Sequence, residues 1–419
     1  MPPFDARAEV GSGVARTPGE DYQRLKRAVA GELLPAAVVD LDAVERNATV
    51  ILDKLEGTPV ALRLATKSIR VPEVLRILLE MGHSRFRGLM TYSAAETLAL
   101  SEMGFDDLFL AYPIGRAVEA QLLARVVSDG RRLAVVVDAV EQVRLLAEAA
   151  RSAEVELPVC LDLDASWRPA WGKLHFGVRR SPLRDVHRAV ALAEVIERVP
   201  GVRLVGLMAY EAQVAGLREH NPTSRQLDPI RRLIKERSVP HVAAFRSEVV
   251  AALEARGHAM TLVNGGGTGS LGTTPRDRSV TEVTAGSGFY CPHLFDHYAG
   301  LPLVPAAFAA LPVTRHSDPD HITCFGGGYV ASGPLGEDRM PVVHLPPGLA
   351  ALDLEGFGEV QTPLRVLDGA AIPGVGDPVF IRHAKAGELM ERFSEVLLVR
   401  GESVVGRART YRGHGWSFG

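Results

Sequence analysis

The stretch RLAVVVDAVEQVRLLAEAARSAEVELPVCLDLD, residues 132–164, contains the repeating unit that decides the fold. It begins with a continuous apolar run at 132–138, passes through the amphipathic segment 139–152 and ends in a second apolar run at 157–164. The middle segment has helical periodicity, whereas the two runs are short and uninterrupted. Such runs are typical of parallel strands that are buried on both faces, so the stretch predicts a strand, a helix and a second strand.

The same alternation continues on both sides of this unit, from residue 59 to residue 285. It predicts eight strands, and eight is the number at which a parallel strand–helix repeat closes into a (β/α)8 barrel. An open, doubly wound sheet is the competing arrangement, which the strand count disfavours. The runs expected as strands are 59–66, 87–93, 107–113, 132–138, 157–164, 202–210, 260–266 and 279–286.

The chain is expected to divide into three parts. Residues 1–33 form an N-terminal arm and helix, of which 1–20 is expected to be mobile because it is rich in Gly, Pro and charge. Residues 44–300 form the barrel. After about residue 300, helical periodicity gives way to Gly, Pro and short β runs, so residues 301–419 are expected to form a separate C-terminal β domain.

Composition excludes several classes of function. Basic residues number 47 and acidic residues 50, so the net charge of −3 gives no electrostatic support for a nucleic-acid or anionic-membrane partner. The three cysteines, Cys160, Cys291 and Cys324, lie far apart, which argues against disulfides and a thiolate zinc site. No signal core and no membrane-length apolar run is present, so we expect a cytoplasmic protein that acts on a small molecule.

Lysine is rare in this chain. Only six of the 47 basic residues are lysines, and each one is therefore a candidate for chemistry that arginine cannot perform, such as imine formation. Lys67 directly follows the first expected barrel strand, at the end of the barrel from which functional loops leave. A lysine in such a mouth can lose its proton and attack an aldehyde. The alternative is a surface lysine that is paired with a carboxylate.

Two glycine-rich turns follow the seventh and eighth expected strands. In VNGGGTGS, residues 263–270, the glycines let the backbone approach an anion closely, and the N–H groups of residues 267–269 together with the Thr268 hydroxyl are suited to a phosphate. In TAGSGFY, residues 284–290, Gly286, Ser287 and Gly288 offer the second half of the same cradle. Phosphate sites of barrels commonly form after strands seven and eight, so the pair predicts a phosphate-binding site.

A third candidate lies in the C-terminal part of the chain. The segment FIRHAKAGELMERF, residues 380–393, places His383, Lys385 and Glu388 within six residues of one another. Such a density of polar groups favours function over a purely structural role. Other polar residues at expected strand ends, about half of which we expect to be helix caps or ion pairs, are Tyr92, Glu96, Asp162, Asp164, Arg179, Arg180, Tyr210, Glu211 and Gln213.

These features together resemble the fold-type III pyridoxal-phosphate enzymes, in the D-threonine aldolase and D-serine dehydratase branch rather than the alanine racemases proper. The resemblance extends over nearly the whole chain from Leu34 onward, and it implies that strand 34–43 belongs in space to the C-terminal β domain. The motifs that carry it, in the family's order, are PAAVVDLDAVERN (35–47), RLATKS (63–68), SAAETLAL (93–100), VNGGGTGS (263–270), TAGSGFY (284–290) and GDPVFIRHAKAG (376–387).

The resemblance also implies roles for individual residues. Lys67 would hold pyridoxal phosphate as an imine and later act as the base at Cα, and His383 would bind a divalent metal and face the β-hydroxyl of the substrate. The family's second metal ligand is replaced here by Lys385, whose ammonium has no lone pair, so a metal is doubtful and Lys385 is expected to supply the positive charge itself. The remaining implied cofactor-binding residues are Arg63, Tyr210, Asn264, Gly266, Gly267, Thr268, Gly286 and Ser287.

The reaction expected from this resemblance is retro-aldol cleavage of a D-configured β-hydroxy amino acid to glycine, or a small amino acid, and an aldehyde. Dehydration to a 2-oxo acid and ammonia is the closest alternative. A racemase, which needs a second base from Lys385 or a tyrosine, and a non-catalytic cofactor carrier are also considered. The family commonly forms homodimers, so a homodimer is expected as well.

Overall fold

The structure is a computed structural model that describes residues 16–221, 224–334 and 336–418. Most of the expected mobile arm, residues 1–15, lies outside the described residues. The first element is helix α1 (Pro18–Ala28), which lies within the expected N-terminal arm and helix and begins at the end of the stretch 1–20. Its start is fixed by a capping box, in which the Thr17 side chain accepts from the Glu20 backbone and the Glu20 carboxylate accepts from the Thr17 backbone.

Within the described residues, eight parallel strands form a closed barrel, which confirms the (β/α)8 prediction over the doubly wound sheet. Seven of the eight expected runs contain one of these strands, and the run at 87–93 overlaps a strand that begins one residue earlier, at Phe86. They are β2 (Ala61–Ala65), β3 (Phe86–Thr91), β4 (Leu108–Leu110), β5 (Leu133–Val137), β6 (Leu157–Asp162), β7 (Val202–Ala209), β8 (Leu262–Gly265) and β9 (Glu282–Ala285). The ring closes where β9 pairs in parallel with β2.

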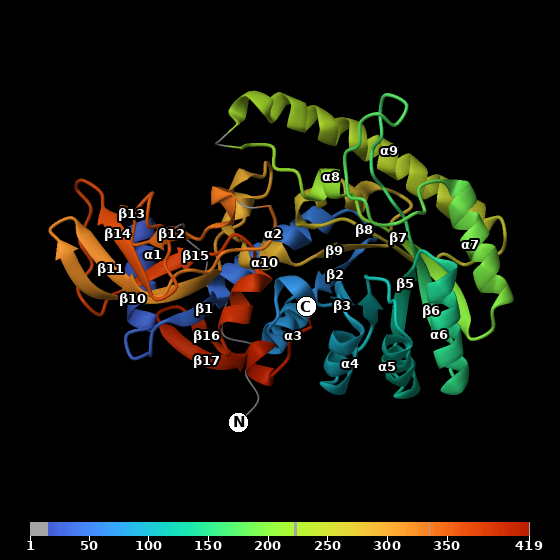
Figure 1. Cartoon of the computed structure of the whole chain (residues 1–419), viewed down its shortest axis with the longest axis horizontal. Helices are drawn as coiled ribbons and strands as arrows, with labels where there is room; N and C mark the ends of the chain where they lie inside the picture. The colour runs from blue at the N-terminus through green and yellow to red at the C-terminus, as the bar shows by residue number, and fades with distance from the viewer. Residues whose placement is uncertain (1–15, 222–223, 335, 419) are drawn as a thin grey trace.

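Helices cover the outside of the barrel, as Figure 1 shows. Every residue of β2 and β5 is buried because one face of each strand looks into the barrel and the other packs against this outer layer. Among the described residues, no helix is both long and apolar enough to cross a membrane. The helices after α1 are α2 (Leu41–Leu55), α3 (Pro72–Met81), α4 (Ala94–Glu102), α5 (Ala117–Ser128), α6 (Val140–Ser152), α7 (Val186–Arg198), α8 (Ala212–Ala215), α9 (Asp228–Glu254) and α10 (Ser287–Tyr290).

A second sheet lies beside the barrel, on the left of Figure 1. It has nine strands among the described residues, and its β1 is the first strand of the chain, pairing antiparallel with β10 and parallel with β16. The strands are β1 (Ala36–Asp40), β10 (Ala307–Asp318), β11 (His321–Phe325), β12 (Val342–Leu345), β13 (Leu349–Ala351), β14 (Gln361–Val366), β15 (Pro378–Arg382), β16 (Glu395–Arg400) and β17 (Ser403–Arg409). The loop after β15 carries His383 and Lys385 toward the barrel.

Candidate active site

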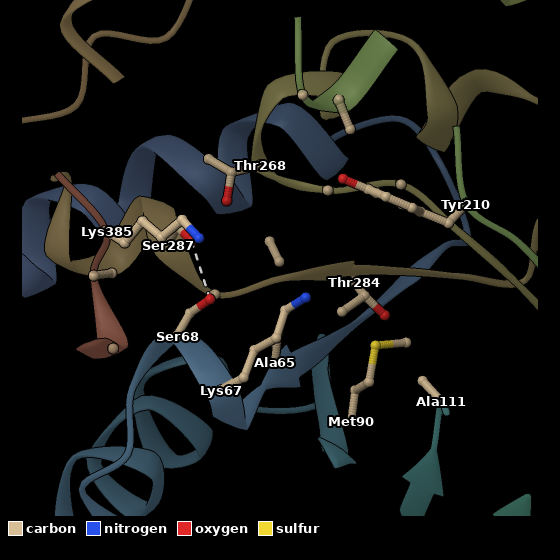
Figure 2. A pocket seen from close by; sticks show the side chains of 18 of the residues that line it. Ala65, Lys67, Ser68, Met90, Ala111, Tyr210, Thr268, Thr284, Ser287 and Lys385 are labelled. Carbon is tan, nitrogen blue, oxygen red and sulfur yellow. Dashed lines mark hydrogen bonds between the residues drawn. The ribbon is translucent and has the colours of Figure 1, made fainter. Parts of the chain in front are cut away.

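A cavity of about 420 Å³ opens at the carboxyl ends of the barrel strands. Its lining comes from the ends of barrel strands, from the two glycine-rich turns and from residues 385–388 of the loop after β15. The volume lies in the range typical of small-molecule sites. Figure 2 shows side chains that project into this cavity, with Lys67 and Tyr210 among them.

Lys67 stands in a short 3₁₀ turn, Thr66–Ser68, that directly follows β2. The turn is fixed to the neighbouring strand, because the Thr66 hydroxyl donates a hydrogen bond of 2.9 Å to the carbonyl of Met90 on β3. The Nζ atom of Lys67 donates to the Tyr112 hydroxyl at 2.8 Å. Within the described residues Lys67 forms no ion pair, so the carboxylate-paired surface lysine considered from the sequence is not what the structure shows.

The two glycine-rich turns meet beside Lys67. Thr268 lies in the first turn and accepts a hydrogen bond of 3.1 Å from the backbone N–H of Gly288 in the second. The hydroxyls of Ser287 and Ser68 are 3.0 Å apart, the contact drawn dashed in Figure 2. Three hydroxyls and the first N–H groups of two short helical turns therefore surround one end of the cavity, a set of donors suited to a phosphate.

Glu211 holds the first glycine-rich turn in place. This buried carboxylate accepts a hydrogen bond of 3.0 Å from the backbone N–H of Gly266 and further bonds from the hydroxyls of Ser270 and Thr274. Arg246 balances its charge, with a guanidinium nitrogen 3.2 Å from the carboxylate. The Gly266 N–H is therefore committed to Glu211. From the sequence alone, Glu211 was only one of several polar residues at strand ends.

Asn264 and Arg63 belong mainly to the barrel interior rather than to the ligand space. The Asn264 side chain reaches the cavity lining, but its amide donates to Glu282 at 2.7 Å and to Thr284 at 2.8 Å. Arg63 does not line the cavity. Its guanidinium is buried in ion pairs with Glu282 at 2.8 Å and Asp107 at 2.9 Å. The expected contact of Arg63 with the cofactor is therefore corrected: its guanidinium is engaged by Glu282 and Asp107 and has a structural role.

Tyr210 lies on the cavity wall beside the first glycine-rich turn, as Figure 2 shows. A Cβ atom on Gly267 would be 3.5 Å from the Tyr210 ring, an ordinary contact distance, and 3.0 Å from the Cβ atom of Ala215, so the turn lies beside the ring and packs tightly against Ala215. Burial raises the pKa of Tyr210 to about 12, and the neighbouring charge of Glu211 adds to this effect. The phenol is therefore neutral at physiological pH and offers a flat, uncharged surface to a ligand.

The loop after β15 brings Lys385 to the cavity but leaves His383 behind it. Lys385 Nζ donates to the Ser332 hydroxyl at 2.6 Å and lies 3.1 Å from the Glu388 carboxylate. Burial opposes ionisation of Glu388, but hydrogen bonds from Ser332 and Lys385 outweigh it and lower the pKa of this carboxyl. His383 does not line the cavity: it is buried, which lowers its pKa, and its Nδ1 lies 2.6 Å from the Lys385 carbonyl oxygen. The expected contact of His383 with the substrate is thereby corrected.

These side chains do not form a donor set for a metal ion. His383 Nε2 is buried without a hydrogen-bond partner among the described residues, but the group two residues later is the ammonium of Lys385, which repels a cation. In the same part of the chain, no three His, Cys, Asp or Glu side chains are grouped so that they could hold a metal. No metal-dependent step is therefore derived.

Two polar groups of the cavity, Tyr112 and Ser68, were not singled out from the sequence as site residues. Tyr112 ends an apolar run and Ser68 follows the lysine. Ser332, which holds Lys385 from outside the cavity lining, lies in a loop far from the site in sequence. Arg180 was recognised only as a polar residue near a strand end. It lines the cavity and forms no hydrogen bond or ion pair with the described residues, so it is free for an anionic group of a ligand.

The model of the family described as "Alanine racemase, N-terminal domain" matches residues 39–290. This range includes the whole barrel, Lys67 and both glycine-rich turns, and it is more than half of the chain. The chain therefore belongs to this family, as the sequence motifs indicated.

Two curated relatives give a finer comparison. The 3-hydroxy-D-aspartate aldolase of Paracoccus denitrificans (strain Pd 1222) is 24% identical over 279 residues, which are 67% of this chain and 64% of the relative. The chain thus matches less than two thirds of the length of that relative. The D-threonine aldolase of Arthrobacter sp is also 24% identical, over 364 residues that span 83% of this chain and 87% of the relative.

Solved structures share the complete fold. The D-threonine aldolase from Filomicrobium marinum superposes with a TM-score of 0.75 at 22% identity, covering 91% of this chain and 95% of that one. The D-threo-3-hydroxyaspartate dehydratase from Delftia sp. HT23 gives 0.71 at 20% identity, covering 91% and 98%. At these identities the likeness establishes the arrangement of barrel and β domain.

Proposed function

We propose that this chain is a pyridoxal-phosphate-dependent lyase that cleaves a β-hydroxy-D-amino acid between Cα and Cβ, giving glycine and an aldehyde. One observation carries the proposal: Lys67 projects into the same cavity as a ring of hydroxyl and N–H donors suited to a phosphate. An amine and a phosphate cradle in one cavity match a ligand that carries an aldehyde and a phosphate ester. The names of the two curated relatives support the substrate class.

The residues present fit this cofactor. Thr268, Ser287 and Ser68 would hold its phosphate, Tyr210 would lie against its ring, and Lys67 would bind its aldehyde carbon. Arg180 would face one of the anionic groups. When bound, the cofactor stabilises negative charge at Cα of the substrate, which is the chemistry that the protein itself lacks.

The protein's own contribution begins with proton transfer at Lys67. When it does not hold the cofactor, its Nζ would accept the proton of the substrate's β-hydroxyl as the Cα–Cβ bond breaks, and would then deliver a proton to Cα. Lys385 lines the cavity from the β domain, where Glu388 and Ser332 hold its ammonium. We assign to this ammonium the stabilisation of negative charge on the β-oxygen as the aldehyde forms.

His383 takes a positioning role in this proposal. Its imidazole contacts the backbone N–H and the carbonyl of Lys385, at 3.0 and 2.6 Å from Nδ1. The ring therefore fixes the direction in which the loop presents the lysine side chain. This replaces direct action of His383 on the substrate, because the histidine lies outside the cavity lining.

The first experiment is spectroscopic. The purified protein is mixed with pyridoxal phosphate, its visible absorption is recorded before and after borohydride reduction, and Lys67→Ala is treated in parallel. We expect a visible band that reduction fixes to the peptide containing Lys67 and that the variant lacks. If wild type shows no band, the cofactor assignment is wrong.

The second experiment separates the possible reactions. D-threonine, D-3-hydroxyaspartate and D-phenylserine are offered with their L-isomers as controls, and all products are measured. Glycine with an aldehyde supports the lyase. A 2-oxo acid with ammonia would instead assign dehydration. The ammonium of Lys385 would then donate a proton to the leaving hydroxyl. An isomerised amino acid without fragments would assign racemisation.

We also propose that the protein works as a homodimer. The start of α9 exposes Leu227, Ile230 and Leu233, which are spaced three residues apart and so lie on one side of the helix. Trp171, in the loop after β6, is 99% exposed. Exposed apolar side chains on one side of a helix are typical of interfaces. Light scattering on the purified chain should give twice the 45.1 kDa of one copy, and a single-copy mass would refute the dimer.

A further inference from the structure

The contact between Lys67 and Tyr112 places a phenol at the amine to which proton transfer is assigned. Tyr112 follows β4, two strands along the barrel wall from β2, and its hydroxyl is 2.8 Å from Lys67 Nζ. The same Nζ lies 5.5 Å from the centre of the Tyr112 ring. Both side chains line the cavity. Of all the described residues, Tyr112 is the one whose side chain hydrogen-bonds this amine.

Tyr112 is held in this position by its surroundings. Its partly buried ring packs against a cluster at the barrel mouth that includes Phe109, Cys160 and Met208. The adjacent Ala111 is fixed by a backbone hydrogen bond of 3.1 Å from its N–H to the carbonyl of Thr91. The contact with Lys67 therefore comes from a packed side chain and not from a flexible one that happens to reach the lysine.

The chemistry of the partner distinguishes this contact from an ordinary ion pair. A carboxylate only accepts hydrogen bonds, so it would favour the ammonium form of Lys67 and oppose its action as a base. A phenol accepts a hydrogen bond from an ammonium and donates one to an amine, since its hydroxyl carries both a proton and lone pairs. Tyr112 can therefore keep Nζ in one place in both protonation states.

We propose that Tyr112 is a catalytic residue that holds the proton-transferring Nζ atom of Lys67 in both of these states. The proposal rests on the proposed function. As Nζ delivers its proton, an N–H bond breaks and a C–H bond forms at Cα of glycine, and the lysine changes from ammonium to amine. Tyr112 then changes from hydrogen-bond acceptor to donor. Its own proton stays on its oxygen, so no other proton source is needed.

The contact is tested first without cofactor. The protein is labelled with an amine-reactive reagent at one fixed pH, and the rate at which Lys67 is modified is measured by mass spectrometry for wild type, Tyr112→Phe and Tyr298→Phe. Tyr298 lines the same cavity but donates to the carbonyl of Ala215 at 3.2 Å, so it is the matched control. Loss of a hydrogen bond that holds Nζ leaves the amine more accessible to the reagent, so Lys67 of Tyr112→Phe should be labelled about 3- to 10-fold faster than Lys67 of wild type. An unchanged labelling rate would overturn the proposal.

The catalytic role is tested with cofactor bound. Exchange of the Cα hydrogen of glycine with deuterated water is followed by NMR, because it reports proton transfer at Cα without the aldehyde. We expect Tyr112→Phe to slow exchange about 10- to 100-fold at saturating glycine, with Tyr298→Phe close to wild type and circular dichroism unchanged. A faster labelling of Lys67 with wild-type exchange would leave Tyr112 without a catalytic role. If wild type itself exchanges no hydrogen, the proposed function fails, and the labelling result still decides whether the contact exists.

Discussion

The backbone carbonyl of Lys67 lies directly against Gly387, so closely that a Cβ atom at Gly387 would be 2.0 Å from the oxygen. The first residue belongs to the turn after β2, and the second belongs to the short helical turn Gly387–Arg392 that follows the Lys385 loop. Glycine is thus required where the β domain meets the barrel. This contact sets how far Lys385 stands from Lys67 across the cavity.

Gly387→Ala should therefore damage the site, although Gly387 has no side chain that takes part in the reaction. A real Cβ cannot approach a backbone oxygen so closely, and the loop must move away. We expect the free energy of unfolding to fall by about 1–3 kcal/mol and turnover to fall with it. Gly272→Ala is the control, because a Cβ there meets no atom within 4 Å. Equal stability and turnover of Gly387→Ala and wild type would show that the contact between the β domain and the barrel does not position the residues of the site.

Removing the charge of Lys385 should reduce turnover more than cofactor binding. Lys385→Gln keeps a polar side chain of similar reach but lacks the ammonium that we place near the β-oxygen. We expect kcat to fall about 10- to 100-fold, as for loss of a charge-stabilising group, while the visible cofactor band stays. Lys173→Gln, which changes an exposed lysine outside the cavity lining, should behave like wild type. A loss of the cofactor band in Lys385→Gln would instead place Lys385 with the cofactor.

Most of the fold could be predicted from the sequence because periodicity is a local property. Most barrel strands are short, largely apolar runs, and Lys67 and both glycine-rich turns follow such runs directly. Contacts between residues that are far apart in the sequence could not be predicted from local patterns. Ser332 and Lys385 lie 53 residues apart in the chain, and nothing in either segment indicates the contact. The direction of a side chain was also hidden, so His383 and Arg63 were expected in the ligand space although both point elsewhere.

The buried Glu96 should make stability depend on pH. It lies on α4 and accepts hydrogen bonds from the Tyr411 hydroxyl at 2.8 Å and the Tyr92 N–H at 2.7 Å. Burial raises its pKa from 4.5 to about 7, although these hydrogen bonds act in the opposite direction. The folded protein therefore holds this proton more tightly than the unfolded chain does. The stabilisation from Glu96 is complete below pH 4.5 and is lost as the pH rises to about 7.

Urea unfolding at several pH values checks this prediction. The shift in pKa corresponds to about 3 kcal/mol between pH 4.5 and 7. Glu96→Gln cannot ionise, so its free energy of unfolding should fall less than that of wild type over this window. Glu80→Gln, at an exposed position, should follow the wild-type curve. If the difference between wild type and Glu96→Gln stays constant with pH, Glu96 does not titrate in this range.

Glu211 should control phosphate binding without touching the phosphate. It joins the Gly266 N–H, two hydroxyls and Arg246, so one carboxylate fixes the shape of the turn that contains Thr268. Glu211→Gln keeps the size of the side chain but replaces one acceptor oxygen by a donor, which leaves a buried hydroxyl or N–H without its partner.

Such a loss costs about 1–3 kcal/mol, so we expect affinity for pyridoxal phosphate to fall about 10- to 100-fold. Affinity for pyridoxal, which lacks the phosphate, should fall much less. This difference separates a loosened phosphate turn from general unfolding. Glu254→Gln, at the exposed end of α9, is the control. Equal losses for the two ligands would mean that Glu211 stabilises the barrel as a whole and does not shape the phosphate turn.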